Sequence, residues 1–137
     1  MDLDDCLRKG LIKKTRVDLE LIQSLVEMAQ IKEDAVNNAE INQINISAYV
    51  SLAYDALREA LEAFCVKSGY KVLSHVCIGE LLKKLVDNLY FEEFDRVRWI
   101  RNSINYYGQK VDFDQGTELI KKIFAIKKEI LARLQSG

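Results

Sequence analysis

The sequence contains no proline and only six glycines in 137 residues. Because proline and glycine most often interrupt helices and mark tight turns, their scarcity favours long helices over a sheet built from hairpins. The chain is rich in Leu, Ile, Ala, Glu and Lys, and its shares of apolar residues (49%) and charged residues (30%) are typical of globular proteins rather than disordered ones. We therefore expect an all-α protein whose residues 1–137 form a single domain.

Histidine and paired cysteine motifs are also scarce. His75 is the only histidine, and its place after Ser74 at an expected helix start favours a role in packing or in a helix-end hydrogen bond over catalysis. The three cysteines, Cys6, Cys65 and Cys77, form no Cys-x-x-Cys spacing. We therefore predict no metal site and no cofactor, and we expect the cysteines to be reduced thiols of a cytoplasmic protein.

Long apolar runs and an excess of one charge are absent as well. No segment approaches the ~20 apolar residues of a membrane span, and the first residues are acidic where a secretion signal would be basic, so we expect no membrane partner. The net charge of -1 gives no overall attraction to nucleic acid, so an RNA contact would depend on a local patch. We interpret Glu59 and Glu62 as solvated charges. The lysines at positions 83–84, 121–122 and 127–128 favour a solvated face, with a basic binding surface as the alternative.

Apolar residues recur at helical spacing along most of the chain. They predict helices over residues 17–40, 47–68, 74–89, 90–107 and 114–134, and a short N-terminal helix over residues 3–14. We expect Ser47 and Asp114 to act as N-caps, and Gly69 and Gly108 to end the helices before them. Short links favour antiparallel neighbours, so the predicted fold is an up-and-down bundle of about four long helices plus the short one.

Residues 95–108 combine cations, amides and aromatic side chains, and they end at a glycine. On a helix, Arg98, Arg101, Asn102 and Asn105 fall within one arc of about 100°, beside the apolar arc of the same helix. Asparagine is a poor helix former, so two of them within a helix indicate a side-chain role. We predict a binding site along this polar strip, with simple solvation of the helix as the alternative.

The aromatic residues of this segment lie on another arc. Trp99 and Tyr106 are expected on the side away from Val97 and Ile104, where they must meet another helix or another subunit. Large exposed apolar patches commonly mark interfaces, which favours a second subunit. Packing into the core of the same chain is the alternative.

The residues Arg101-Asn102-Ser103-Ile104-Asn105-Tyr106 resemble the Arg-Asn-x-x-x-His signature of HEPN domains, a family of small helical proteins that includes metal-independent ribonucleases and toxins of toxin–antitoxin pairs. The resemblance extends over residues 17–134, because residues 47–85 are similar to the family's central helix, glycine turn and following helix. The sequence departs from the family at position 106, where tyrosine replaces the catalytic histidine.

The resemblance implies a HEPN-like fold and a homodimer in which two motif helices face each other across a cleft. It assigns the catalytic positions to Arg101, Asn102 and Tyr106, and it places Arg98, Asn105 and Tyr107 in the binding cleft. Arginine suits phosphate because its planar group donates two hydrogen bonds. A phenol titrates near 10 and stays protonated at neutral pH, so Tyr106 should transfer protons poorly and ribonuclease activity should be weak or absent.

Three functions remain open from the sequence. The first is a dimeric module that binds RNA or a partner protein. The second is an active, metal-independent ribonuclease toxin held in check by a nucleotidyltransferase antitoxin, a partner that in this family can modify a tyrosine near the motif, here Tyr106 or Tyr107. The third is a purely structural dimerisation module.

Overall fold

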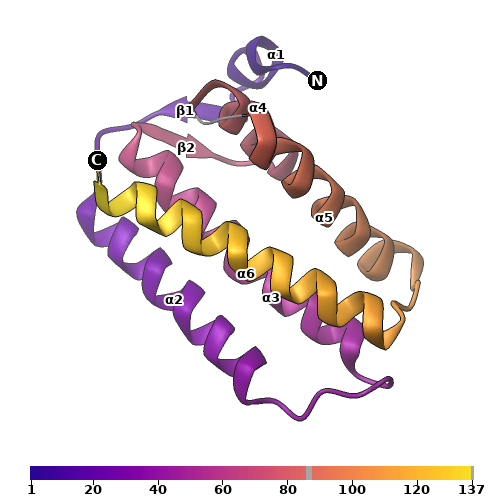
Figure 1. Cartoon of the computed structure of the whole chain (residues 1–137). Helices are drawn as coiled ribbons and strands as arrows, with labels where there is room; N and C mark the ends of the chain where they lie inside the picture. Colours follow the sequence, from indigo (N-terminus) through magenta and orange to yellow (C-terminus); the bar gives the residue numbers. More distant parts are fainter. Residues whose placement is uncertain (86–87, 137) are drawn as a thin grey trace.

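The computed structural model describes residues 1–85 and 88–136, and the side chains of all of these except residues 75, 85, 88–91, 105–107 and 136. This part of the chain folds into six helices and two short strands (Figure 1). Their order is α1 (Leu3–Arg8), β1 (Ile12–Lys14), α2 (Leu19–Asn38), α3 (Ile46–Lys67), β2 (Tyr70–Val72), α4 (His75–Leu85), α5 (Asn88–Tyr107) and α6 (Phe113–Ser136). The all-α fold class is confirmed, with α2, α3, α5 and α6 as the long helices.

The N-terminal segment differs from its prediction. The helix expected over residues 3–14 ends at Arg8, and Gly10 then adopts a left-handed conformation with φ +72°. The following residues form β1, which pairs antiparallel with β2 so that Ile12 lies opposite Val72. Helical spacing alone could not reveal this pairing, because the two strands are far apart in the sequence.

Two predicted N-caps are also corrected. Helix α3 begins one residue earlier than expected, and the Ser47 hydroxyl instead accepts a hydrogen bond from the Val111 backbone N–H at 2.8 Å. Helix α6 begins at Phe113, and the backbone N–H groups of Asp114 and Gln115 donate to the Asp112 carboxylate. The glycine ends are confirmed, since Gly69 and Gly108 have φ +92° and φ +64°.

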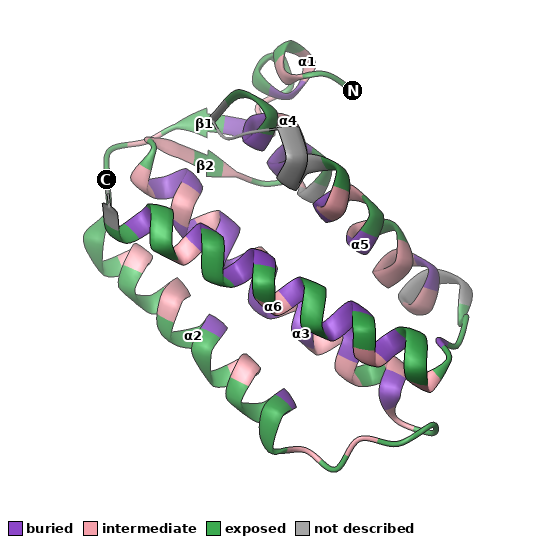
Figure 2. Ribbon diagram, viewed as in Figure 1, coloured by how far each residue is buried: buried purple, intermediate pink, exposed green. Residues whose placement is uncertain are grey.

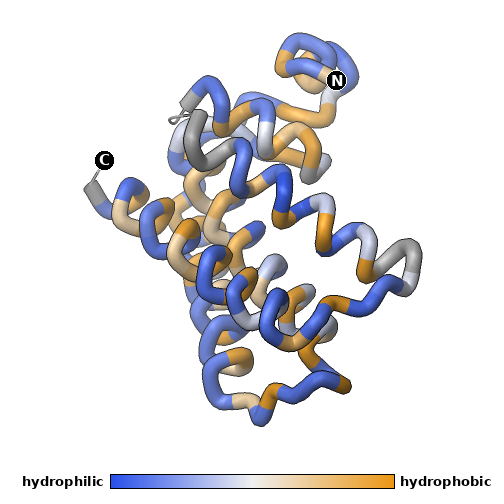
Figure 3. The backbone as a smooth tube through the Cα atoms, turned by 45° about the vertical axis from the view of Figure 1, so that its right-hand side comes forward, coloured by the Kyte–Doolittle hydropathy of each residue, from blue (hydrophilic) through white to orange (hydrophobic). Residues whose placement is uncertain are grey.

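Helix α3 lies at the centre of the bundle, packed against α2, α5 and α6 (Figure 1). Most of its residues are buried, whereas only Ala29 and Val36 of α2 are (Figure 2). The long helices alternate hydrophilic and hydrophobic segments, as expected for amphipathic helices (Figure 3). Near the middle of α3 the fully buried Tyr54 stacks on Phe94 of α5, with ring centroids 6.1 Å apart. This contact positions α5 against α3.

Two charged residues that we predicted to be solvated are buried. Only 7% of the surface of Glu59 in α3 is exposed, and only 2% of that of Lys127 in α6. Lys127 lies in the same seam as the buried residues Ile120, Ile123, Ile130 and Leu134, whose spacing of three and four residues places it on the core-facing side of the helix. The adjacent Lys128 is exposed, so the pair does not form a uniform solvated face.

The cysteine prediction is wrong for two of the three thiols. Cys6 of α1 and Cys77 of α4 form a disulfide, with their Cα atoms 5.9 Å apart and 71 positions between them in the sequence. The β1–β2 pairing carries α1 onto α4 and so brings the two cysteines together, which no local spacing indicates. Cys65 stays a free thiol in the same small apolar cluster, beside Ile12 and Leu81.

A candidate binding site between helices α3 and α5

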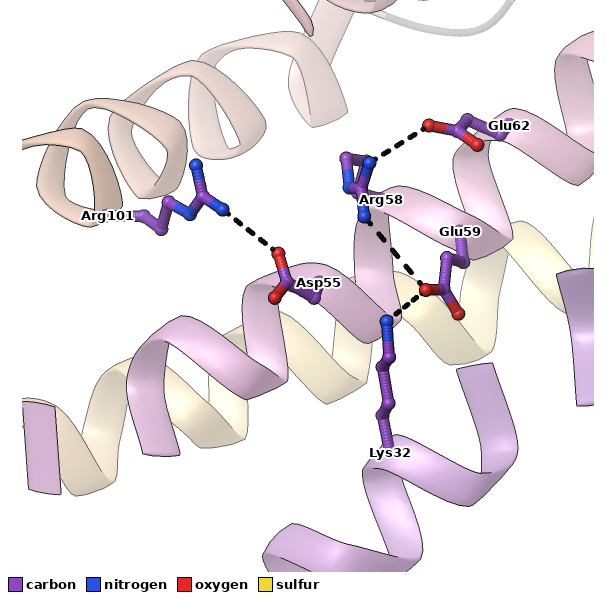
Figure 4. A network of polar contacts seen from close by, with 6 residues as sticks. All are labelled: Lys32, Asp55, Arg58, Glu59, Glu62 and Arg101. Atoms are coloured by element: carbon purple, nitrogen blue, oxygen red, sulfur yellow. Dashed lines mark hydrogen bonds and ion pairs between the residues drawn. The ribbon is translucent and has the colours of Figure 1, made fainter. Parts of the chain in front are cut away.

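Arg101 connects the motif helix α5 to the central helix α3. Its Nη2 donates to Asp55 Oδ1 at 3.2 Å (Figure 4). Its guanidinium carbon lies 5.2 Å from the centroid of the Tyr54 ring. A cation this close to a ring face is attracted to it. The Arg101 side chain retains 15% of its exposure, so its stem is packed while its head is held at a fixed place at the edge of the core.

The positive charges of two further arginines act on Tyr54. Arg98, one turn before Arg101, donates to Asp95 Oδ1 at 2.7 Å, and Arg58 extends from α3. Burial raises the pKa of Tyr54 to about 12, although the positive charges of Arg101, Arg98 and Arg58 act in the opposite direction. Desolvation therefore dominates, and Tyr54 stays a neutral phenol. We call Arg58, Arg98 and Arg101, gathered around Tyr54, the arginine cluster.

Acidic residues on α3 extend the site toward α2. Arg58 lies between two carboxylates of its own helix, with 4.0 Å to Glu59 and 3.5 Å to Glu62, and Lys32 of α2 also pairs with Glu59 (Figure 4). Burial raises the pKa of Glu62, with the positive charge of Arg58 opposing it. The second carboxylate oxygen of Glu59 is buried without a hydrogen-bond partner among the described residues. Glu59 and Glu62 are thus part of an ion-pair network rather than the solvated charges we predicted.

The charges of this network balance. The cations Lys32, Arg58, Arg98 and Arg101 are matched by the carboxylates of Asp55, Glu59, Glu62 and Asp95. A site without net charge exerts little long-range attraction on nucleic acid. A phosphate that binds here therefore competes with the carboxylates for the arginines, and we expect modest affinity.

The structure brings together part of the predicted site. Arg98 and Arg101 lie on one side of α5 beside Tyr54, and Asn102 is half-buried next to them. The side chains of Asn105, Tyr106 and Tyr107 lie outside the described part of the structure, so the substitution of tyrosine for the family's histidine is not tested by geometry. Their backbone belongs to the last turn of α5.

Tyr54, Asp55 and Arg58 are site residues that sequence reasoning missed. They occupy the middle of α3, where the apolar stripe drew attention to the core and the charged positions looked like an ordinary polar face. A tyrosine followed by an aspartate, with an arginine one turn later, was the available signal. Its meaning depends on α5 packing alongside, which is a tertiary contact that no local pattern predicts.

Trp99 lies on the outer side of α5 with 66% of its surface exposed. The alternative that Trp99 packs into the core of this chain is therefore wrong. Beside it is a small pocket of about 170 Å³, whose lining combines the apolar Ile100, Ile104 and Val111 with the polar Ser103, Gln109, Lys110 and Gln115. An exposed indole is a feature that a partner subunit could cover.

Among the side chains that the structure describes, which do not include that of His75, no group of three or more His, Cys, Asp or Glu residues is arranged to hold a metal ion. None of the described helices combines the length and the apolar character needed to cross a membrane. The chain matches no protein-family model and no curated protein.

Proposed function

We propose that this protein is a HEPN-like dimeric module that binds RNA, or a partner protein, at the arginine cluster and cleaves RNA weakly or not at all. One observation carries the proposal: Arg101, the arginine of the HEPN-like motif, is held half-buried on the Tyr54 ring by Asp55. A motif arginine that served only to solvate the helix would have no such fixed place. The resemblance to HEPN domains supplies the class of ligand.

RNA phosphate is the ligand that suits this arrangement best. Arginine donates two parallel hydrogen bonds to a phosphate as readily as to a carboxylate, so a phosphate can take the place of Asp55 on Arg101. The packed stem of Arg101 limits the conformational entropy that is lost when the ligand binds. A carboxylate of a partner protein could make the same exchange, and the experiment below distinguishes the two ligands.

Cleavage needs a group that transfers protons near neutral pH. Tyr106 at the family's histidine position is a phenol, and Tyr54 in the arginine cluster has its pKa raised to about 12 by burial, so neither is suited to that task. Binding is therefore better supported than turnover. The second function, an active ribonuclease toxin with a nucleotidyltransferase antitoxin, requires a proton-transfer group that the described residues of the arginine cluster do not supply.

The cellular location belongs to the same proposal. HEPN-like modules that act on RNA would work in the cytoplasm, where thiol reductants keep most cysteines reduced. The oxidation state of Cys6 and Cys77 in cells tests this placement, because an intact disulfide there would favour an oxidising compartment.

The test is RNA binding by Arg101→Ala, with Arg96→Ala as the matched control on the exposed side of α5. We expect Arg101→Ala to weaken binding of a single-stranded RNA roughly tenfold and to reduce the salt dependence by about one counterion, because one phosphate contact is lost. Arg96→Ala should change affinity little. Fluorescence anisotropy at several salt concentrations measures both quantities, and circular dichroism checks that each variant is folded.

Asp55→Asn tests, in the same assay, whether the Asp55 carboxylate competes with RNA phosphate for Arg101. Removing the competing carboxylate should tighten RNA binding, because the phosphate no longer has to displace it. Equal affinities for wild type, Arg101→Ala and Asp55→Asn would show that the arginine cluster does not bind RNA, and an acidic partner protein would then be the ligand to examine. Strong wild-type cleavage in excess chelator, with growth arrest on expression, would instead establish the toxin function.

A further inference from the structure

A second candidate site lies on the opposite side of the central helix, between α2 and α6. A groove of about 510 Å³ runs between these helices, within the ~300–1,000 Å³ range of small-molecule sites. Its lining includes Gln30, Glu33 and Asn37 from α2, and Phe124, Lys127 and Leu131 from α6. None of its lining residues belongs to α5, which carries Arg98 and Arg101 of the arginine cluster.

Lys127 is the unusual member of this lining. It occupies a core-facing position of α6 and retains only 2% of its exposure, where an apolar side chain would be the ordinary choice. Burying an ammonium group is costly unless it is well paired. The acceptor that the structure gives it is Glu33 Oε1, at a long 3.4 Å. An ammonium has three N–H donors, so this single contact leaves capacity for a further acceptor.

We infer that the α2–α6 groove binds a small molecule that carries a carboxylate or phosphate group on an apolar body. The anionic group would bind Lys127 and displace the Glu33 carboxylate, which is more exposed than Lys127 and can turn toward water. The apolar body would lie against Phe124 and Leu131. The exposed Lys128 at the groove adds a second positive charge against the single carboxylate of Glu33, which favours an anion over a cation.

The experiment uses three probes that share a phenyl group: 3-phenylpropionate, phenyl phosphate and the uncharged 3-phenylpropanol. Binding to the whole protein is measured by titration calorimetry. We expect at least one anion to bind ten-fold or more tightly than the alcohol, because a charged hydrogen bond contributes about 1.5–3 kcal/mol. The preference for propionate or for phosphate identifies which anion the groove is built to take.

Two lysine variants locate the anion. Lys127→Met should weaken binding of the preferred anion about ten-fold or more and abolish its advantage over the alcohol, whereas Lys122→Met, at an exposed lysine of α6 that does not line the groove, should change affinity less than about three-fold. Glu33→Gln keeps Lys127 and removes the competing carboxylate, so it should tighten anion binding. This variant keeps the test decisive if Lys127→Met does not fold.

Three results would overturn the inference. The first is no heat of binding for any probe at millimolar concentration, and the second is equal binding of the anions and the alcohol. The third is an equal loss in Lys127→Met and Lys122→Met, or weaker binding in Glu33→Gln, either of which would assign the attraction to general surface charge. The RNA affinity of the Arg101→Ala variant does not enter this test, so the two sites stand or fall separately.

Discussion

Tyr54 shows how burial decides the behaviour of a single titratable group. Its ring is fully buried between Phe94 and Arg101, and three arginines stand near its hydroxyl. Positive charges favour the phenolate, yet the pKa of the group rises to about 12, because loss of water is the larger effect. Cys65 behaves in the same way, since burial raises the pKa of its thiol to about 12. That pKa makes Cys65 a structural rather than a reactive thiol.

These two groups predict a loss of stability in alkali. In the unfolded chain the thiol ionises near pH 9 and the phenol near pH 10, but in the folded protein both do so only near pH 12. Between these pH values only the unfolded state releases the two protons. The contribution of the two groups to the free energy of unfolding is therefore complete below pH 9 and declines as the pH rises toward 12. Each group should lower the free energy of unfolding by at most about 1.4 kcal/mol per pH unit.

Urea unfolding between pH 8 and pH 11 measures this decline. Cys65→Ala should remove the part of the decline in the free energy of unfolding that begins near pH 9. Tyr54→Phe should remove the part that begins near pH 10, so each variant is a control for the other. A slope that is unchanged in both variants would mean that other groups cause the alkaline loss.

Sequence reasoning succeeded for residues whose role is set by their own helix. It placed Arg98, Arg101 and Asn102 on one polar strip at the edge of the apolar arc, and the structure confirms that placement. It failed where a partner from another element decides the role. Asp55 is important because Arg101 reaches it, and Lys127 is paired because Glu33 of α2 reaches it, and neither fact is written in the local pattern.

At the scale of elements, the N-terminal arm formed by α1 and β1 depends on few contacts. Of its residues only Cys6 and Ile12 are buried, and it is attached through the short β1–β2 ladder and the Cys6–Cys77 disulfide. Regions with so little buried apolar surface open locally before the rest of a protein unfolds. The disulfide is therefore the main constraint on this arm.

Reduction of that bond should destabilise the protein. A cross-link that spans 71 positions restricts the unfolded chain by up to about 4 kcal/mol, so dithiothreitol should lower Tm on the order of 10 °C. Amide exchange should become faster in α1 and β1 while α3 keeps its protection. Cys65→Ala should respond to reductant as wild type does, whereas Cys6→Ser/Cys77→Ser should not respond. A wild-type Tm that ignores reductant would show that the bond does not form in solution.

The sequence predicts the long helices, but it does not predict the contacts that join distant segments. The long helices follow from apolar spacing, and the ends of α3 and α5 follow from Gly69 and Gly108, because only these positions need a left-handed backbone there. The β1–β2 ladder and the disulfide were not predictable, since both join segments far apart in the chain. Their formation depends on where α4 lies relative to α3, which is a property of the folded bundle.

At the scale of the whole molecule, the exposed Trp99 on α5 is the feature that argues for self-association. We expect a dimer at micromolar concentration, with at least ~1,200 Å² buried in total. Trp99→Ala should shift the population toward monomer, because aromatic residues often dominate such contacts. Leu19→Ala is the matched control, since Leu19 is an equally exposed apolar residue on α2, at 73%.

Sedimentation equilibrium of wild type, Trp99→Ala and Leu19→Ala measures this shift from dimer to monomer. A wild-type monomer at these concentrations, or a dimer that Leu19→Ala disrupts and Trp99→Ala does not, would remove α5 from the interface. The dimeric part of the proposed function would then fail, while RNA binding by a single chain would remain open to the Arg101→Ala test.

The Cys6–Cys77 bond also gives the chain an unusual covalent shape. It closes a ring that contains α2, α3 and both strands, and it leaves α5 and α6 on a linear tail that leaves the ring just after Cys77. The helix that carries the core and the Asp55 carboxylate thus belongs to the ring, and the helix that carries Arg101 belongs to the tail. A protease that nicks the link between α2 and α3 would open the ring without releasing a fragment, since both pieces stay joined through sulfur. The candidate site forms only where the tail folds back onto the ring.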